Sequence, residues 1–174
     1  EGLGEHKEQY HAIFVYSTTT HVPLIVRVPG GRRGVVVTDI ASTLDITPTI
    51  LESLGIPQPA PGKNPAMQGV SLLGAAARGQ RVPARSLFLE SIYPSASYGW
   101  ATVRAIVQPS WKLIELPEPE LYDMAGDPSE TQNLHETLPA RVGEVRSEYD
   151  KLLAEVQSAA TEAEAATIDD ETRD

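Results

Sequence analysis

Histidine is the residue type in this sequence best suited to chemistry, and two of the four histidines, His6 and His11, stand close together near the start. An imidazole can transfer a proton, or donate a hydrogen bond to charge that develops on a reacting oxygen. The spacing alone suits equally well two loop histidines that are bonded to backbone. His21 and His135 lie outside any plausible site, and we assign them no chemistry.

A second group of candidate residues is the aromatic segment from Tyr93 to Trp100, with Arg104 close behind it. Tyr98, Trp100 and Arg104 could contact the organic part of a substrate. The alternative for Trp100 is ordinary hydrophobic packing.

Asp45 and Thr47 are polar residues that we assign to helix capping rather than to chemistry. Thr47 precedes Pro48, which suits a first helical position, and Gly55 suits the end of the helix. The helix could also begin earlier, near Ser42 or Asp45. Its apolar residues, Leu44, Ile50, Leu51 and Leu54, are expected to face inward.

The elements that must position these residues fall into two groups. The run from Val22 to Val28 is apolar at nearly every position, which predicts an interior strand of a sheet covered on both faces. Four later ranges predict short antiparallel strands: 86–93, 101–107, 111–116 and 120–124. Apolar residues at helical spacing predict a helix over about 139–159 that covers one face of this sheet.

The composition excludes several classes of protein. There is no cysteine, which excludes disulfides and thiolate metal sites. No apolar run approaches the ~20 residues that cross a bilayer. The net charge is −10, but much of it lies after Ser158 in what we expect to be a disordered acidic tail. No Lys/Arg-rich face suggests a nucleic-acid partner.

Three separated stretches of the sequence resemble the sulfatase family of the alkaline-phosphatase superfamily. The first is Gly-Leu-Gly-Glu-His from position 2, followed by His11, Phe-Val-Tyr at 14–16 and Val-Pro-Leu-Ile at 22–25. The second is Asp-Ile-Thr-Pro-Thr from position 45, followed by Gly-Ile-Pro at 55–57. The third is Trp-Lys-Leu-Ile from 111, then Glu-Leu-Tyr-Asp from 120, Asp-Pro-Ser-Glu from 127 and Asn-Leu from 133.

The resemblance implies a fold and a division of the chain. The fold class is α/β: the C-terminal part of an alkaline-phosphatase-like α/β core, then a small antiparallel sheet subdomain with a C-terminal helix. The expected ranges are 1–75 for the core part, 76–138 for the β subdomain, 139–160 for the packing helix and 161–174 for the acidic tail. We expect the chain to be a fragment that lacks the nucleophile and metal-ligand segments of such a protein.

The resemblance also implies a site. His11 stands where relatives place a His or Lys that contacts the transferred sulfate or phosphate, or a second metal, although Lys7 and Ala12 stand where glycine is usual. His6 is expected to have a structural hydrogen-bonding role, and Glu-Leu-Tyr-Asp from 120 a structural turn. The expected substrate is a small-molecule or glycan sulfate ester. The expected cofactor is a divalent metal, Ca or Mg, bound mainly by residues upstream of Glu1, and no metal ligand is assigned within this chain.

Two alternatives stay open at this point. One is a phosphatase, phosphonate hydrolase or phosphoethanolamine-type transferase of the same superfamily, with Zn or Mn as its metal. The other is a non-catalytic interaction module. The isolated chain of 174 residues is expected to be inactive. Relatives are often exported, which favours a periplasmic or extracellular protein.

Overall fold

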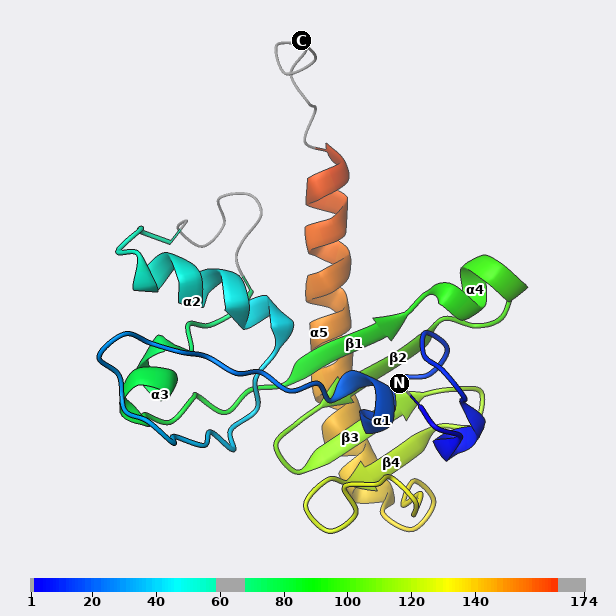
Figure 1. The fold of residues 1–174 in the computed structure, drawn as a ribbon. Helices are drawn as coiled ribbons and strands as arrows, with labels where there is room; N and C mark the ends of the chain where they lie inside the picture. Colours follow the sequence, from blue (N-terminus) through cyan, green and yellow to red (C-terminus); the bar gives the residue numbers. More distant parts are fainter. Residues whose placement is uncertain (1, 59–67, 166–174) are drawn as a thin grey trace.

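An antiparallel sheet forms the centre of the protein (Figure 1), and the computed structural model describes residues 2–58 and 68–165. The strand order is β1-β2-β3-β4, and each strand pairs with its neighbour along the chain. The four ranges are β1 (Leu87–Ser91), β2 (Val103–Val107), β3 (Trp111–Glu115) and β4 (Glu120–Asp123). All four predicted strands are confirmed.

One face of the sheet is covered by α5 (Pro139–Ala165), as the apolar spacing predicts (Figure 1). Successive residues on a strand point to opposite faces, so Ile106, Leu113 and Leu121 turn together toward this helix. They pack against Val142, Val145 and Tyr149 of α5. Burying each such side chain stabilises the fold by about 1.5–3 kcal/mol. The helix runs on to Ala165, into the range expected to be a tail, and residues 166–174 lie outside the described residues.

The opposite face of the sheet is covered by the N-terminal segment, which the sequence pattern did not predict. Val15 and Tyr16 are almost fully buried against Val103, Ala105 and Ile114. This packing fixes the start of the chain on the β subdomain, although the expected division at residue 75 separates the two in sequence. The division itself stays a prediction.

The turn after β4 is held by side-chain oxygens, as its polar residues predict. Asp123 accepts hydrogen bonds from the amides of Ala125 and Gly126. Asp127 accepts from Thr131 and Gln132, and Asn133 accepts from Leu121 and His135. Glu-Leu-Tyr-Asp and its sequel are therefore structural.

The first predicted helix has the earlier of the two starts considered, near Ser42, and ends just before Gly55 as expected, but several side chains expected to face inward are exposed. The helix is α2 (Ile46–Ser53), which follows directly on the 3₁₀ turn η2 (Thr43–Asp45). Ser42 is the N-cap of η2, in a capping box with Asp45, whereas Thr47 lies inside α2 and does not cap it. Leu44, Ile50 and Leu54 are each more than half exposed, whereas Pro48 and Thr49 are buried. The predicted burial of Leu44, Ile50 and Leu54 was wrong because the neighbouring segments pack on the side of α2 that carries Pro48 and Thr49.

The prediction of an interior strand at Val22–Val28 was also wrong. These residues belong to no strand, and Ile25 is 93% exposed. A strand needs a neighbour for its backbone hydrogen bonds, and within the described residues the sheet contains only β1 to β4. An apolar sequence does not by itself supply that neighbour.

Three short helices complete the fold. They are α1 (Ser17–Thr20), α3 (Leu73–Arg78) and α4 (Tyr93–Tyr98), and a 3₁₀ turn, η1 (Glu5–Lys7), lies near the start of the chain. In Figure 1, α2 and α3 lie to the left of the sheet and α4 lies to its right, at the end of β1. The predicted strand over 86–93 therefore stops earlier, and its end forms part of α4.

Candidate functional site

The loop that carries His11 is closed at its base by backbone hydrogen bonds. The amide of Gly2 donates to the carbonyl of Tyr10 at 2.6 Å, and the amide of Gly4 donates to the carbonyl of Glu8 at 3.0 Å. A side chain on Gly2 would lie 2.6 Å from the carbonyl oxygen of Glu8, so only glycine fits there. His11 lies at the exposed end of this loop.

The backbone keeps left-handed conformations where the family pattern has glycine. Lys7 has φ 64° and Ala12 has φ 86°. Such conformations cost a residue with a Cβ atom about 1–2 kcal/mol. The two substitutions therefore leave the loop conformation in place at an energetic cost.

Replacing Ala12 by glycine is expected to stabilise the protein by about 1 kcal/mol, because glycine adopts a positive φ without strain. Urea unfolding followed by tryptophan fluorescence measures the change. The control is Ala96→Gly within α4, where glycine should destabilise. An Ala12→Gly variant less stable than the parent would show that the backbone of Ala12 is not strained.

A hollow of about 570 Å³ lies beside His11. Its walls include Thr19 and Thr20 from the N-terminal segment and Ser91 and Tyr93 from the sheet side. The Ser91 hydroxyl donates to the carbonyl of Ala12, which ties β1 to the loop. The hollow is also lined by the carboxylate of Glu90, whose charge is balanced by the guanidinium of Arg104. Among the lining side chains His11 carries the ring N–H groups, so it is the candidate donor to an anion there.

An aromatic cluster leads away from the same hollow. Tyr93, which lines the hollow, lies edge-on to Tyr98 with ring centres 5.8 Å apart. Tyr98 lies 5.0 Å from Trp100 in turn. All three rings are about half exposed. The structure therefore brings the predicted residues Tyr98 and Trp100 together, next to Tyr93, which lines the same hollow as His11.

Arg104 does not line the hollow itself, although its ion-pair partner Glu90 does. Its guanidinium donates to the carboxylate of Glu90 at 2.7 Å, across the β1–β2 pair. Because side chains alternate along a strand, Arg104 shares the face of Ile106, which α5 covers. The N-terminal segment with His11 covers the other face.

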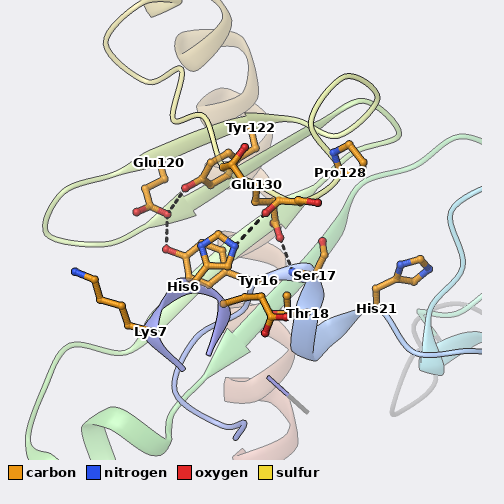
Figure 2. Close-up of a pocket in the computed structure, with 13 residues that line it drawn as sticks. His6, Lys7, Tyr16, Ser17, Thr18, His21, Glu120, Tyr122, Pro128 and Glu130 are labelled. Carbon is orange, nitrogen blue, oxygen red and sulfur yellow. Dashed lines mark hydrogen bonds between the residues drawn. The ribbon is translucent and has the colours of Figure 1, made fainter. Parts of the chain in front are cut away.

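His6 lies in a second hollow, of about 830 Å³ (Figure 2). Its ring stacks on Tyr16 at 3.7 Å, and its Nε2–H donates to the carbonyl of Ser129 at 3.1 Å. This contact agrees with the structural role expected of His6. His6 and His11 are close in the sequence, but the fold places them in separate hollows.

Glu120 joins two phenols at this second hollow (Figure 2). The hydroxyl of Tyr16 donates to its carboxylate at 2.6 Å, and that of Tyr122 donates to the same oxygen at 2.9 Å. Burial first, and then the negative charge of Glu120, raise the pKa of both tyrosines. A raised pKa favours the protonated phenol, so neither Tyr16 nor Tyr122 is suited to act as a base.

The sequence comparison decides the family. Residues 4–162 match the family described as N-sulphoglucosamine sulphohydrolase, C-terminal. The chain belongs to this sulfatase family. The resemblance predicted from the three separated stretches is confirmed.

Two curated relatives resemble this sulfatase domain along most of its length. It is 27% identical over 161 residues to arylsulfatase K of Bos taurus, a match that covers 87% of this chain and 28% of that protein. It is 32% identical over 158 residues to the uncharacterized sulfatase YidJ of Escherichia coli K12, covering 88% of this chain and 29% of that protein. The domain therefore spans under a third of the length of these relatives.

Two solved structures share the fold. One is a Bacteroides thetaiotaomicron protein assigned as a sulfatase, with a TM-score of 0.70 and 25% identity over 97% of this chain and 36% of that one. The other is the phosphonate monoester hydrolase SpPMH of Silicibacter pomeroyi, with a TM-score of 0.63 and 24% identity over 90% of this chain and 33% of that one. The predicted alkaline-phosphatase-like fold is confirmed.

The described part of this sulfatase domain does not fit a metal. Residues 2–58 and 68–165 contain no group of three or more His, Asp or Glu side chains that could hold an ion. At the second hollow, Glu120 is bonded to tyrosines and Glu130 to Lys112. We therefore derive no catalytic step through a metal bound by these residues. In the same described range, no helix has the length and apolar character to span a membrane.

Glu8 and Ser91, which hold the His11 loop, were missed by the sequence analysis. Glu8 stands among exposed residues in a polar segment, so nothing in its surroundings marks it as buried. Ser91 is distant in sequence from Ala12, its partner.

Proposed function

We propose that this chain is the C-terminal domain of a metal-dependent sulfatase, and that His11 acts on the sulfate group of an ester substrate. The observation that carries the proposal is the position of His11 beside a hollow that also reaches the aromatic cluster. An imidazole N–H there would donate to sulfate oxygens as negative charge shifts toward the departing ester oxygen.

The organic part of the ester would lie against Tyr98 and Trp100. Aromatic faces of this size contribute large apolar contact areas, and both rings are accessible. A sulfated sugar or a smaller aryl ester would fit this description. Arg104 has its charge satisfied by Glu90, and we do not assign it to the substrate.

The remaining chemical groups are proposed to come from outside this chain. We propose that the nucleophile and a divalent metal, calcium or magnesium, are held by residues that precede Glu1 in the whole protein. Bound there, the metal would supply a Lewis acid for the sulfate oxygens. We also propose, by analogy with relatives, that the protein acts in the periplasm or outside the cell.

In the whole protein, His11→Ala is expected to lower kcat for an aryl sulfate by about 100-fold, the effect of removing one donor to developing charge. The matched control is His135→Ala, in the turn between β4 and α5, which should retain activity. The isolated chain of 174 residues should show no turnover with the same ester, with or without calcium or magnesium.

Three outcomes would contradict parts of this proposal. An active His11→Ala protein would remove His11 from the reaction. Turnover by the isolated chain would show that the chemistry needs nothing outside it. Faster hydrolysis of an aryl phosphonate than of the aryl sulfate would favour the phosphonate alternative, which the fold neighbour SpPMH keeps open.

A further inference from the structure

Glu8 is a buried acid in an otherwise exposed loop. Its side chain is only 5% exposed, while Lys7 and Gln9 on either side are exposed. Its Oε1 accepts a hydrogen bond from the amide of Ile13 at 2.8 Å, and both carboxylate oxygens lie 3.4 Å from the amide nitrogen of Phe14. Burying a carboxylate is costly unless such donors compensate for the lost water.

These bonds close a short loop with His11 inside it. Glu8 precedes His11, and the amides of Ile13 and Phe14 follow it, so the carboxylate joins the two ends of the loop. Hydrogen bonds to a charged acceptor are about twice as strong as neutral ones. The loop therefore keeps its shape although Ala12 is strained at φ 86°.

A second tie comes from the sheet. The Ser91 hydroxyl, at the end of β1, donates to the carbonyl of Ala12, the residue that follows His11. Ser91 also lines the hollow beside His11. Glu8 thus fixes the loop internally, and Ser91 fixes it relative to the rigid sheet.

We infer that Glu8 is the positioning residue for His11, holding its imidazole at the mouth of the hollow with Ser91 as the second support. The reason for positioning His11 rests on the proposed function, in which His11 acts on a sulfate group. The position of the His11 imidazole itself can be measured without an activity assay.

The test uses the full 174-residue chain with labelled histidine and backbone amides, examined by NMR. In Glu8→Ala, amide hydrogen exchange at Ile13 and Phe14 should become about tenfold faster or more. The ring signals of His11 should shift or broaden. Glu8→Gln keeps one acceptor oxygen and should restore much of the parent behaviour, which a purely electrostatic role would not allow.

Two further variants complete the series. Glu5→Ala is the matched control, because Glu5 lies in the same loop region with an exposed side chain that bonds the nearby amide of Leu3. It should leave the His11 signals unchanged. Ser91→Ala should shift the ring signals of His11 while the hydrogen bonds of the buried Glu8 carboxylate stay as in the parent chain. If Glu8→Ala does not fold, Glu8→Gln and Ser91→Ala still decide the question.

A sodium sulfate titration at constant ionic strength separates the inference from the proposed function. If sulfate shifts the His11 signals of the parent chain, Glu8→Ala should need about fivefold more sulfate for the same shift. If sulfate has no effect on the parent, the sulfate role of His11 loses support, while the exchange rates still test Glu8. His11 signals in Glu8→Ala that coincide with those of the parent would overturn the inference.

Discussion

Glu130→Ala is expected to lower the free energy of unfolding by about 3–5 kcal/mol, the usual effect of breaking a buried ion pair. The Glu130 carboxylate lies 2.6 Å from the ammonium of Lys112, and their side chains are 0% and 1% exposed. Its other oxygen accepts a hydrogen bond from the amide of Ser17 at 2.6 Å. The substitution would therefore leave a buried cation and a backbone donor without their acceptor. Urea unfolding measures the loss.

The effect should depend on pH in a definite direction. Burial lowers the pKa of Lys112, and the Glu130 carboxylate opposes that shift. Without the carboxylate, the folded state favours neutral lysine more strongly, so the unfolded state binds more protons. Stability then rises with pH, and the deficit of Glu130→Ala should shrink as the pH increases toward the ordinary pKa of lysine, about 10.4.

Two controls distinguish the ion pair from a general sensitivity to substitution. Glu90→Ala removes the partly exposed pair with Arg104 and should cost about 1 kcal/mol or less. Replacing both buried partners, as Lys112→Met with Glu130→Leu, should recover much of the loss because no charge is then left unpaired. A Glu130→Ala deficit no larger than that of Glu90→Ala would contradict the prediction.

Asp45→Ala is expected to lower the free energy of unfolding by a similar amount, about 3–5 kcal/mol. Asp45 is fully buried. Its carboxylate accepts from the amides of Ser42 at 2.8 Å and Val70 at 2.9 Å, and it pairs with the Arg85 guanidinium. One side chain thus connects the start of α2, the segment before α3 and the segment before β1. Its loss should loosen all three.

The interactions of the Asp45 carboxylate should also make the stability of the protein depend on pH in the acid range. Burial alone would raise the pKa of Asp45, but Arg85 and the two amides outweigh it and leave the pKa below its ordinary value. A lowered folded-state pKa contributes stability above the unfolded-state value, about 3.9, and that contribution is lost as the pH falls through the folded-state pKa. Asp45→Asn should therefore be less stable at neutral pH and lose less stability on acidification.

Urea unfolding at pH 7 and at pH 3 tests both statements. Glu148→Ala, which removes an exposed partner of Lys151, serves as the control and should change stability by about 0.5 kcal/mol or less at either pH. The prediction fails if the parent and Asp45→Asn lose equal stability between the two pH values.

Much of the fold could be predicted from the sequence because its signals are local. Alternating apolar residues predict the strands, a spacing of three and four predicts α5, and Asp123, Asp127 and Asn133 mark the turn after β4. The family pattern in three separated stretches was likewise readable from the residues alone. It also identified His11 as the candidate for chemistry.

The tertiary structure alone decided which residues meet. Tyr16 and Glu120 are 104 residues apart, and Ser17 and Glu130 are 113 apart, yet each pair is joined by a hydrogen bond. The sequence also could not separate His6 from His11, because they enter different hollows only where the N-terminal segment crosses the sheet. Periodicity records whether a residue has a buried face but not which distant segment covers it, so the apolar run Val22–Val28 read as an interior strand although no strand of the described residues lies beside it.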